Sequence, residues 1–204
     1  MKKKLLLLGA SSLISVILLE AAISLGAGLG LFPIKVPTYS VDQSRASTFW
    51  LDINPDFGVW HPSRAATRHT KSCFDVTYHS NSHGARDVER AMQSDRPRVV
   101  VLGDSMTEGY GVEDAQRFTN ILEKETGIEH LNFGTSGTFG TTQYYLLYKA
   151  LARTFSHSAV LIGMLPTNDF WDNDIEYGKA VFPDRYRPYL VGEYPNYRLL
   201  YYQK

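Results

Sequence analysis

The run from Arg98 to Leu102 constrains the fold more than any other segment, because it is short, β-branched and apolar. Such a run is typical of a buried parallel strand. It ends in Gly103, Asp104 and Ser105, which predicts a serine at the carboxyl end of a strand, where open α/β sheets hold their reactive groups. Glycine permits a tight turn there, and the N–H groups that open the next segment are free to bind an oxyanion. The other interpretation is an ordinary strand-to-helix turn capped by Asp104 or Ser105.

Composition places the chain among globular proteins. It has 204 residues, of which 44% are hydrophobic and 21% charged, and its formal net charge is zero. That length is enough for one sizeable core. Because there is no basic excess, we expect no nucleic-acid partner. The single cysteine, Cys73, excludes an internal disulfide.

The N-terminus predicts a membrane helix. Three lysines at 2–4 precede an apolar stretch from Leu5 to Ile34, in which Glu20 is the only charged residue. A bilayer span needs about 20 mostly apolar residues. A cleaved signal peptide with its apolar region at Leu5–Leu19 is the alternative, but the apolar run continues past Glu20 without a convincing cleavage site. We therefore expect a single-pass anchor with its N-terminus in the cytoplasm and the rest of the chain outside.

The segment that follows predicts a linker. Residues 35–60 are punctuated by proline and sustain no period, so we expect irregular structure there. Its aromatic residues are either interface anchors or packed under the domain, and packing is favoured for Phe57 and Trp60 over Phe49 and Trp50. The predicted division is an anchor at 1–34, a membrane-proximal linker at 35–77 and an incomplete hydrolase-like domain at 78–204.

Strand and helix signals then alternate. After the strand at Arg98–Leu102, the pattern predicts a helix at Asp114–Thr126, a strand at Glu129–Phe133, a helix at Thr141–Phe155 and a strand at Ser158–Leu165. Strands separated by helices imply a parallel sheet with right-handed crossovers.

Helix ends and faces can also be predicted. Asp114 is the expected N-cap of the first helix and Gly127 its stop. Helical spacing predicts that Phe118, Ile121 and Leu122 face the sheet. In the second helix the spacing predicts a core stripe, formed by Tyr144, Leu147, Tyr148, Leu151 and Phe155.

Each predicted strand ends in a polar loop. The first carries Ser105, the second carries Gly137 within Gly134–Gly137, and the third carries Asn168 within Thr167–Asp169. In a doubly wound sheet these ends converge on one crevice. A serine, a glycine N–H and an asparagine amide together make a nucleophile with oxyanion donors. The structural alternatives are a turn glycine at 137 and an Asx-turn or helix cap at 168.

These three loops resemble the sequence blocks of the SGNH (GDSL-type) hydrolase family. Gly103–Gly109 is similar to the nucleophile block, Asn132–Gly137 to the second block, and Thr167–Asp169 to the third, whose usual leading glycine is replaced here. Upstream, Asn81–Arg86 resembles a segment that often precedes the nucleophile block in membrane-anchored members. The resemblance covers about half the chain, roughly residues 78–175.

The resemblance implies a fold and a chemistry. The fold would be a three-layer α/β domain with a flavodoxin-like parallel sheet, its C-terminal part missing, behind one transmembrane helix. Ser105 would be the nucleophile, and the N–H groups of Ser105 and Gly137 with the amide of Asn168 would form the oxyanion hole. The reaction would be ester hydrolysis through an acyl-enzyme, with no cofactor and no metal. The substrate would be an acyl or acetyl ester, for which a cell-envelope glycan is one candidate.

One part of the family pattern has no counterpart here. The family carries its base in a late Asp-x-x-His motif, and no histidine follows Asn168 in this sequence. Truncation and degeneration are the two explanations, and either leaves the third strand as an open edge. Since serine needs a base, we expect this chain alone to be nearly inactive. His79 or His83 is a remote substitute, and their grouping with His69 and Cys73 fits no common zinc spacing.

Two further functions stay open. A catalytically dead member could bind a glycan or a partner through the crevice and the tyrosine-rich tail at Ile175–Lys204. An O-acyltransferase of envelope glycans would use the same serine.

Overall fold

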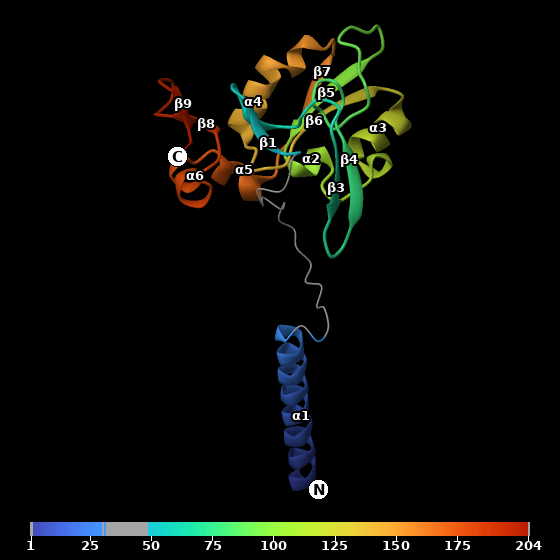
Figure 1. Ribbon diagram of the computed structural model, residues 1–204, viewed down its shortest axis with the longest axis vertical. Coiled ribbons are helices and arrows are strands. Elements are labelled where there is room, and N and C mark those ends of the chain that lie inside the picture. The colour runs from blue at the N-terminus through green and yellow to red at the C-terminus, as the bar shows by residue number, and fades with distance from the viewer. Residues whose placement is uncertain (1, 30, 32–48, 204) are drawn as a thin grey trace. The chain divides into compact units, whose positions relative to one another are not determined.

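The computed structural model describes residues 2–29, 31 and 49–203 (Figure 1). Its contacts divide the chain into one unit at residues 1–38 and a second at residues 39–204.

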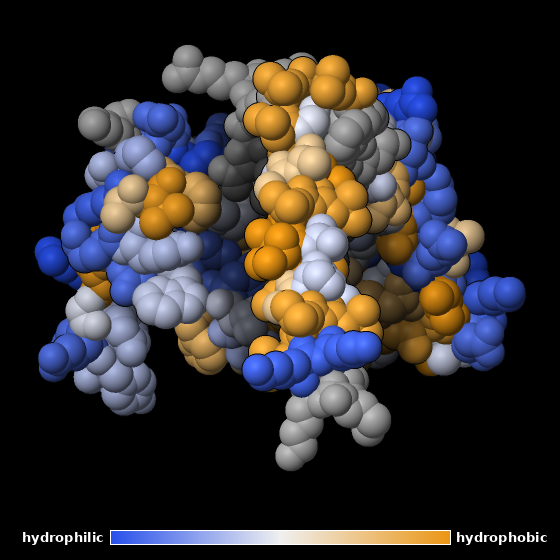
Figure 2. Space-filling view, turned by 90° about the horizontal axis from the view of Figure 1, so that it is seen from below, coloured by the Kyte–Doolittle hydropathy of each residue, from blue (hydrophilic) through white to orange (hydrophobic). Residues whose placement is uncertain are grey.

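The first unit holds a single described helix, α1 (Lys2–Gly28). Within it, Leu6–Gly26 forms a 21-residue stretch of mean hydropathy 2.2, which is long and apolar enough to cross a membrane. Its large apolar side chains are exposed all round, and Figure 2 shows the hydrophobic surface of this helix. A helix that is apolar on every face is suited to burial in lipid rather than to one side of a core.

The second unit is an α/β domain built on a parallel sheet. In the described part of the chain this sheet has three strands, β5 (Arg98–Gly103), β6 (Glu129–Gly134) and β7 (Ala159–Gly163), in the order β6-β5-β7. All three were predicted from the sequence, with small differences in their ends. β6 and β7 are the two outer strands of this order, and the β7 residues Val160, Leu161 and Ile162 are 41%, 40% and 56% exposed, as expected for an open edge.

Helices cover both faces of this sheet. Figure 1 shows α3 (Phe118–Thr126) and α4 (Thr141–Ala150) on opposite sides of it. The remaining helical elements are short: α2 (Ser105–Glu108), α5 (Pro166–Asp172), α6 (Ile175–Val181) and the 3-10 turns η1 (Asp114–Gln116) and η2 (Ala152–Thr154).

The predicted stripe of the second helix is confirmed. Tyr144, Leu147 and Phe155 are fully buried, and Tyr148 and Leu151 pack against the same core. The helix itself is shorter than predicted, because α4 ends at Ala150 and η2 follows.

The predicted face of α3 is wrong at two of its three positions. Phe118 and Ile121 are 36% and 45% exposed, whereas Leu122 is half-buried and Thr119 is buried. The buried neighbour on the sheet is polar: Asn132 Nδ2 donates to Thr119 Oγ1 at 3.1 Å, so a threonine rather than an aromatic side chain fills this contact. Asp114 is also not the N-cap, because η1 begins there after Glu113, whereas Gly127 ends α3 in the left-handed conformation as predicted.

The described part of the chain also contains three antiparallel hairpins. They are β1 (Leu51–Asn54) with β2 (Gly58–Trp60), β3 (Ala66–Thr70) with β4 (Asp75–His79), and β8 (Arg187–Val191) with β9 (Arg198–Tyr202).

The first hairpin corrects the prediction of irregular structure for the described residues of 35–60. Its turn is set locally, because Asn54 Oδ1 accepts from the N–H groups of Asp56 and Phe57, and Gly58 has a φ of +85°. β1 and β2 therefore pair although the sequence shows no alternation of apolar and polar residues there. Packing is confirmed for Phe57 and Trp60, and Phe49 and Trp50 lie in the same core.

Candidate active site

A row of glycines forms the floor of the candidate site. Gly103 ends β5 and pairs with Gly134 of β6 on one side and with Gly163 of β7 on the other. The side chain of Thr107, on α2, rests on this row: a Cβ at any of the three positions would overlap atoms of Thr107. Without side chains at these strand ends, α2 can lie directly against the sheet.

Ser105 opens α2 at the carboxyl end of the central strand, where the sequence predicted it. Asp104 is the N-cap, and its Oδ1 accepts from Met106 N at 2.9 Å. The capping interpretation is thus correct for Asp104, and it leaves Ser105 as the first helical residue. The Ser105 N–H has no hydrogen-bond acceptor within the described residues, and neither does its half-buried hydroxyl.

Gly137 lies in the loop after β6. It is buried and has a φ of +102°, a conformation that favours glycine. A Cβ here would come within 3.1 Å of Val59 and 3.2 Å of the Arg185 guanidinium. Its N–H, like that of Ser105, has no acceptor in the described part of the chain. Buried N–H groups without an acceptor are rare, which makes this one a candidate donor to a ligand.

Asn168 comes from α5, the helix that follows β7. Its Nδ2 donates to Asp104 Oδ2 at 3.4 Å, so the structure brings the third predicted residue to the turn that carries the serine. Its Oδ1 is buried and has no partner among the described residues. No hydrogen bond joins Ser105, Gly137 and Asn168 directly.

Glu108, at the end of α2, ties the nucleophile turn to the Gly137 loop. Its carboxyl group is fully buried and accepts from Ser136 N at 2.6 Å, from Ser136 Oγ and from Trp50 Nε1 at 2.9 Å. His61 Nε2 lies 3.1 Å from its Oε1. Burial alone would raise the pKa of Glu108, but the hydrogen bond and charge of His61, with the bond from Ser136, leave this pKa below its usual value.

Both ring nitrogens of His61 are engaged. Its Nδ1 lies 2.7 Å from the carbonyl of Gly84, which can only accept, so Nδ1 carries a proton. Its Nε2 lies 3.1 Å from Glu108 Oε1 and 3.2 Å from Thr135 Oγ1, whose hydroxyl donates to the carbonyl of Ser136 at 3.2 Å. His61 thus links the Glu108 carboxyl group to the Gly137 loop.

The end of α2 is held by Arg86, which belongs to the predicted upstream segment Asn81–Arg86. This buried guanidinium donates to the carbonyls of Glu108, Gly109 and Val112 at 3.2, 2.6 and 2.7 Å. It also stacks 3.6 Å above the ring of Tyr78. The carbonyls that end the helix are thereby satisfied, which fixes α2 at both ends.

No histidine is placed to act as a base for Ser105. All six histidines lie within the described residues, and none hydrogen-bonds to it. His79 is exposed at the end of β4, and His83 packs its ring against Phe155. His61 has both nitrogens engaged by acceptors. The described residues also contain no group of three His, Cys, Asp or Glu side chains that could hold a metal.

A cluster of buried carboxyl groups lies beside Asn168. Burial raises the pKa values of Asp104 and Asp169, and it raises the pKa of Asp172 to about 6. Tyr144 donates its hydroxyl proton to Asp169 Oδ1 at 2.9 Å, and burial with the nearby carboxyl groups raises the pKa of this phenol too. The cluster holds α5 against α4.

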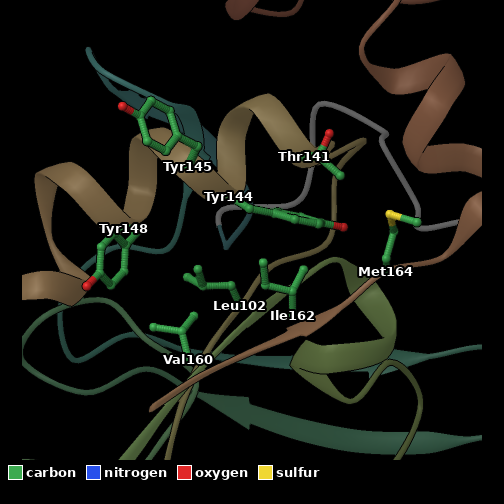
Figure 3. Close-up of a pocket in the computed structure, with 8 residues that line it drawn as sticks. All are labelled: Leu102, Thr141, Tyr144, Tyr145, Tyr148, Val160, Ile162 and Met164. Atoms are coloured by element: carbon green, nitrogen blue, oxygen red, sulfur yellow. The ribbon is translucent and has the colours of Figure 1, made fainter. Parts of the chain in front are cut away.

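An apolar groove of about 280 Å³ opens beside this cluster. Figure 3 shows Tyr144, Tyr145 and Tyr148 of α4 on one side and Leu102, Val160 and Ile162 of the strands on the other. The groove lies along the open edge of the sheet at β7.

Glu108, His61 and Thr135 were not predicted from the sequence. Glu108 lies in the nucleophile block, but no separate role was predicted for it. The sequence does offer a signal for His61. This residue lies in the run Val59–Pro62, whose other residues are apolar, and an imidazole buried there needs a hydrogen-bond partner.

No protein-family model and no curated protein matches this sequence. A proposal about function must therefore rest on the geometry of the loops that carry Ser105, Gly137 and Asn168.

Proposed function

We propose that this chain is an SGNH (GDSL-type) serine esterase domain behind a membrane anchor, and that Ser105 is its acyl-accepting nucleophile. The observation that carries the proposal is the pair of unpaired N–H groups at Ser105 and Gly137. These are the two backbone donors that the sequence blocks imply for the oxyanion hole, and neither has an acceptor among the described residues. Asn168, the third implied donor, lies against the same turn.

The arrangement fits acyl transfer. Ser105 Oγ would attack the carbonyl carbon of an ester, and negative charge would develop on the carbonyl oxygen. Preorganised N–H donors aimed at that oxygen typically supply the largest single part of the rate enhancement. The acyl-enzyme would then be released by water. The parallel sheet with the serine on its central strand, in the order β6-β5-β7, is compatible with the flavodoxin-like fold of this family.

The anchor sets the proposed location. α1 is long and apolar enough to span a bilayer, and three lysines precede the span. Positive charges favour the cytoplasmic side, so the domain would lie outside the cytoplasm. An acyl or acetyl ester of the cell envelope would be within its reach.

The test is acylation of the full chain in mild detergent. The probes are a fluorophosphonate and p-nitrophenyl acetate, with the modified residue located by mass spectrometry. Loss of a triad histidine costs about a millionfold in turnover, but an oxyanion hole with binding alone keeps about 10³–10⁴ over the uncatalysed reaction. We expect one equivalent of slow modification at Ser105, negligible turnover, loss of the label in Ser105→Ala and no change in Ser63→Ala, which alters an exposed serine. Equal labelling of the Ser105→Ala variant would overturn the proposal. Rapid ester turnover that is unchanged by Ser105→Ala would overturn it as well.

A second candidate is favoured by the absence of a histidine at Ser105 among the described residues. A member without a base would retain the crevice as a binding site for a glycan or another ligand. Absence of any modification at Ser105, in a folded chain, would favour this candidate.

A further inference from the structure

The strongest unexplained feature of the molecule is the buried contact between Glu108 and His61. Burying ionisable side chains is expensive, and apolar side chains of similar size often serve stability equally well. Both groups are nevertheless completely enclosed and hydrogen-bonded. A fully satisfied buried polar network of this kind can specify one arrangement of the groups around it.

The groups around this pair belong to the Gly137 loop. Glu108 accepts from both the N–H and the hydroxyl of Ser136, which fixes the residue just before Gly137. Thr135 Oγ1 lies 3.2 Å from His61 Nε2, and its single proton is donated to the Ser136 carbonyl at 3.2 Å.

That carbonyl decides where the Gly137 N–H points. The Ser136 carbonyl and the Gly137 N–H belong to the same planar trans peptide unit, so they point in opposite directions. When Thr135 holds the carbonyl, the N–H must face the other way. A glycine at φ +102° has more backbone freedom than any other residue, so this orientation needs an external constraint.

We propose that Glu108, His61 and Thr135 are positioning residues, which act through the Ser136–Gly137 peptide to hold the Gly137 N–H in its oxyanion-binding orientation. The inference rests on the proposed function for its chemical meaning. The orientation of the peptide can be measured without any reaction.

Thr135→Val is the decisive variant. Valine has the shape of threonine but can form no side-chain hydrogen bond with His61 or with the Ser136 carbonyl. Thr119→Val is its matched control, because Thr119 is also a buried threonine with a hydrogen-bonded hydroxyl, on α3 rather than in the loop. Thr135→Ser keeps the hydroxyl and serves as the rescue.

The measurements are the rate of Ser105 acylation and the amide signal of Gly137 in ¹⁵N-labelled full chain in detergent. Loss of one oxyanion donor costs about 10²–10³ in rate, so a misaligned donor in Thr135→Val should slow acylation by at least about tenfold. Thr119→Val and Thr135→Ser should stay near the wild-type rate. The Gly137 amide shift and its hydrogen exchange should change in Thr135→Val alone.

The outcomes separate the two proposals. If wild type shows no labelling of Ser105, the proposed function fails, and the Gly137 amide signal still decides the positioning. If Thr135→Val and Thr119→Val are alike in both measurements, the positioning inference is overturned. Should Thr135→Val fail to fold, Glu108→Gln takes its place, because it keeps the shape of the side chain but replaces one of the carboxylate oxygens that contact Ser136 and His61.

Discussion

The glycine row makes a quantitative prediction about which added methyl groups the site can accept. In Gly134→Ala the new Cβ would overlap two backbone atoms of α2. One is Glu108 N, and the other is the carbonyl carbon of Thr107, 2.7 Å away. In Gly163→Ala it would overlap only the Thr107 hydroxyl, since its next neighbours, Leu102 O and Thr107 Cβ, lie at 3.7 and 3.8 Å. The backbone atoms that Gly134→Ala would overlap cannot move unless α2 moves, whereas the atom that Gly163→Ala would overlap belongs to a side chain.

Thr107→Ala should therefore rescue one variant and not the other. Overpacking typically costs about 1–3 kcal/mol, so we expect Gly134→Ala near the top of that range and Gly163→Ala near the bottom. The Thr107 hydroxyl is buried without a hydrogen-bond partner among the described residues, so its removal sacrifices no bond. In the Thr107→Ala background, Gly163→Ala should become neutral or stabilising by about 0.5 kcal/mol, because alanine lowers the entropy of the unfolded chain. Gly134→Ala should keep most of its cost.

The assay is urea unfolding of the full chain in detergent, followed by the fluorescence of the core residues Trp50 and Trp60. The two double-mutant cycles give the coupling free energies directly. Equal rescue of both alanine variants by Thr107→Ala would refute the argument, because it would mean that the α2 backbone yields as easily as a hydroxyl.

Three further predictions concern other parts of the chain. Tyr144→Phe removes a hydrogen bond to a carboxyl group and should lower the free energy of unfolding by about 1.5–3 kcal/mol, measured in urea. The pKa of Asp172 is about 6 when folded and about 4 when unfolded, so the folded state binds more protons between these values and stability falls as pH rises through this window. Asp172→Asn should reduce the difference between the free energies of unfolding at pH 4 and pH 7 by about 2 kcal/mol, measured in urea at both pH values. Val16→Arg places a charge in the middle of α1 at a cost of about 3 kcal/mol and should release part of the chain from membranes in carbonate extraction; an unchanged membrane fraction would argue against insertion.

The parallel sheet was predictable because its signals are local. The β-branched strands, their glycine ends and the stop at Gly127 each appear within a few residues of sequence. The hairpin at 51–60 was not, because its strands are short and their pairing depends on the turn chemistry of Asn54 and Gly58. The face of α3 failed for a related reason: its partner on the sheet is the polar Asn132, which no periodicity of α3 itself can reveal.

The candidate site divides in the same way. Ser105, Gly137 and Asn168 could be predicted because each directly follows a strand. Glu108 and His61 are 47 residues apart in sequence, and their pairing arises only when the first hairpin closes on the sheet. Long-range polar networks of this kind leave no spacing in the sequence that could point to them.

The strand order has a consequence for the synthesis of the chain. β5 is the central strand, yet it is made before both of its neighbours, β6 and β7. Until β6 and then β7 emerge, the backbone edges and apolar side chains of β5 have no partners, and slow non-local pairing leaves such intermediates prone to aggregation. The order in which the ribosome delivers the strands therefore leaves the central strand of the sheet without partners until its neighbours emerge, and chaperone contact should be most valuable while residues 98–103 wait for them.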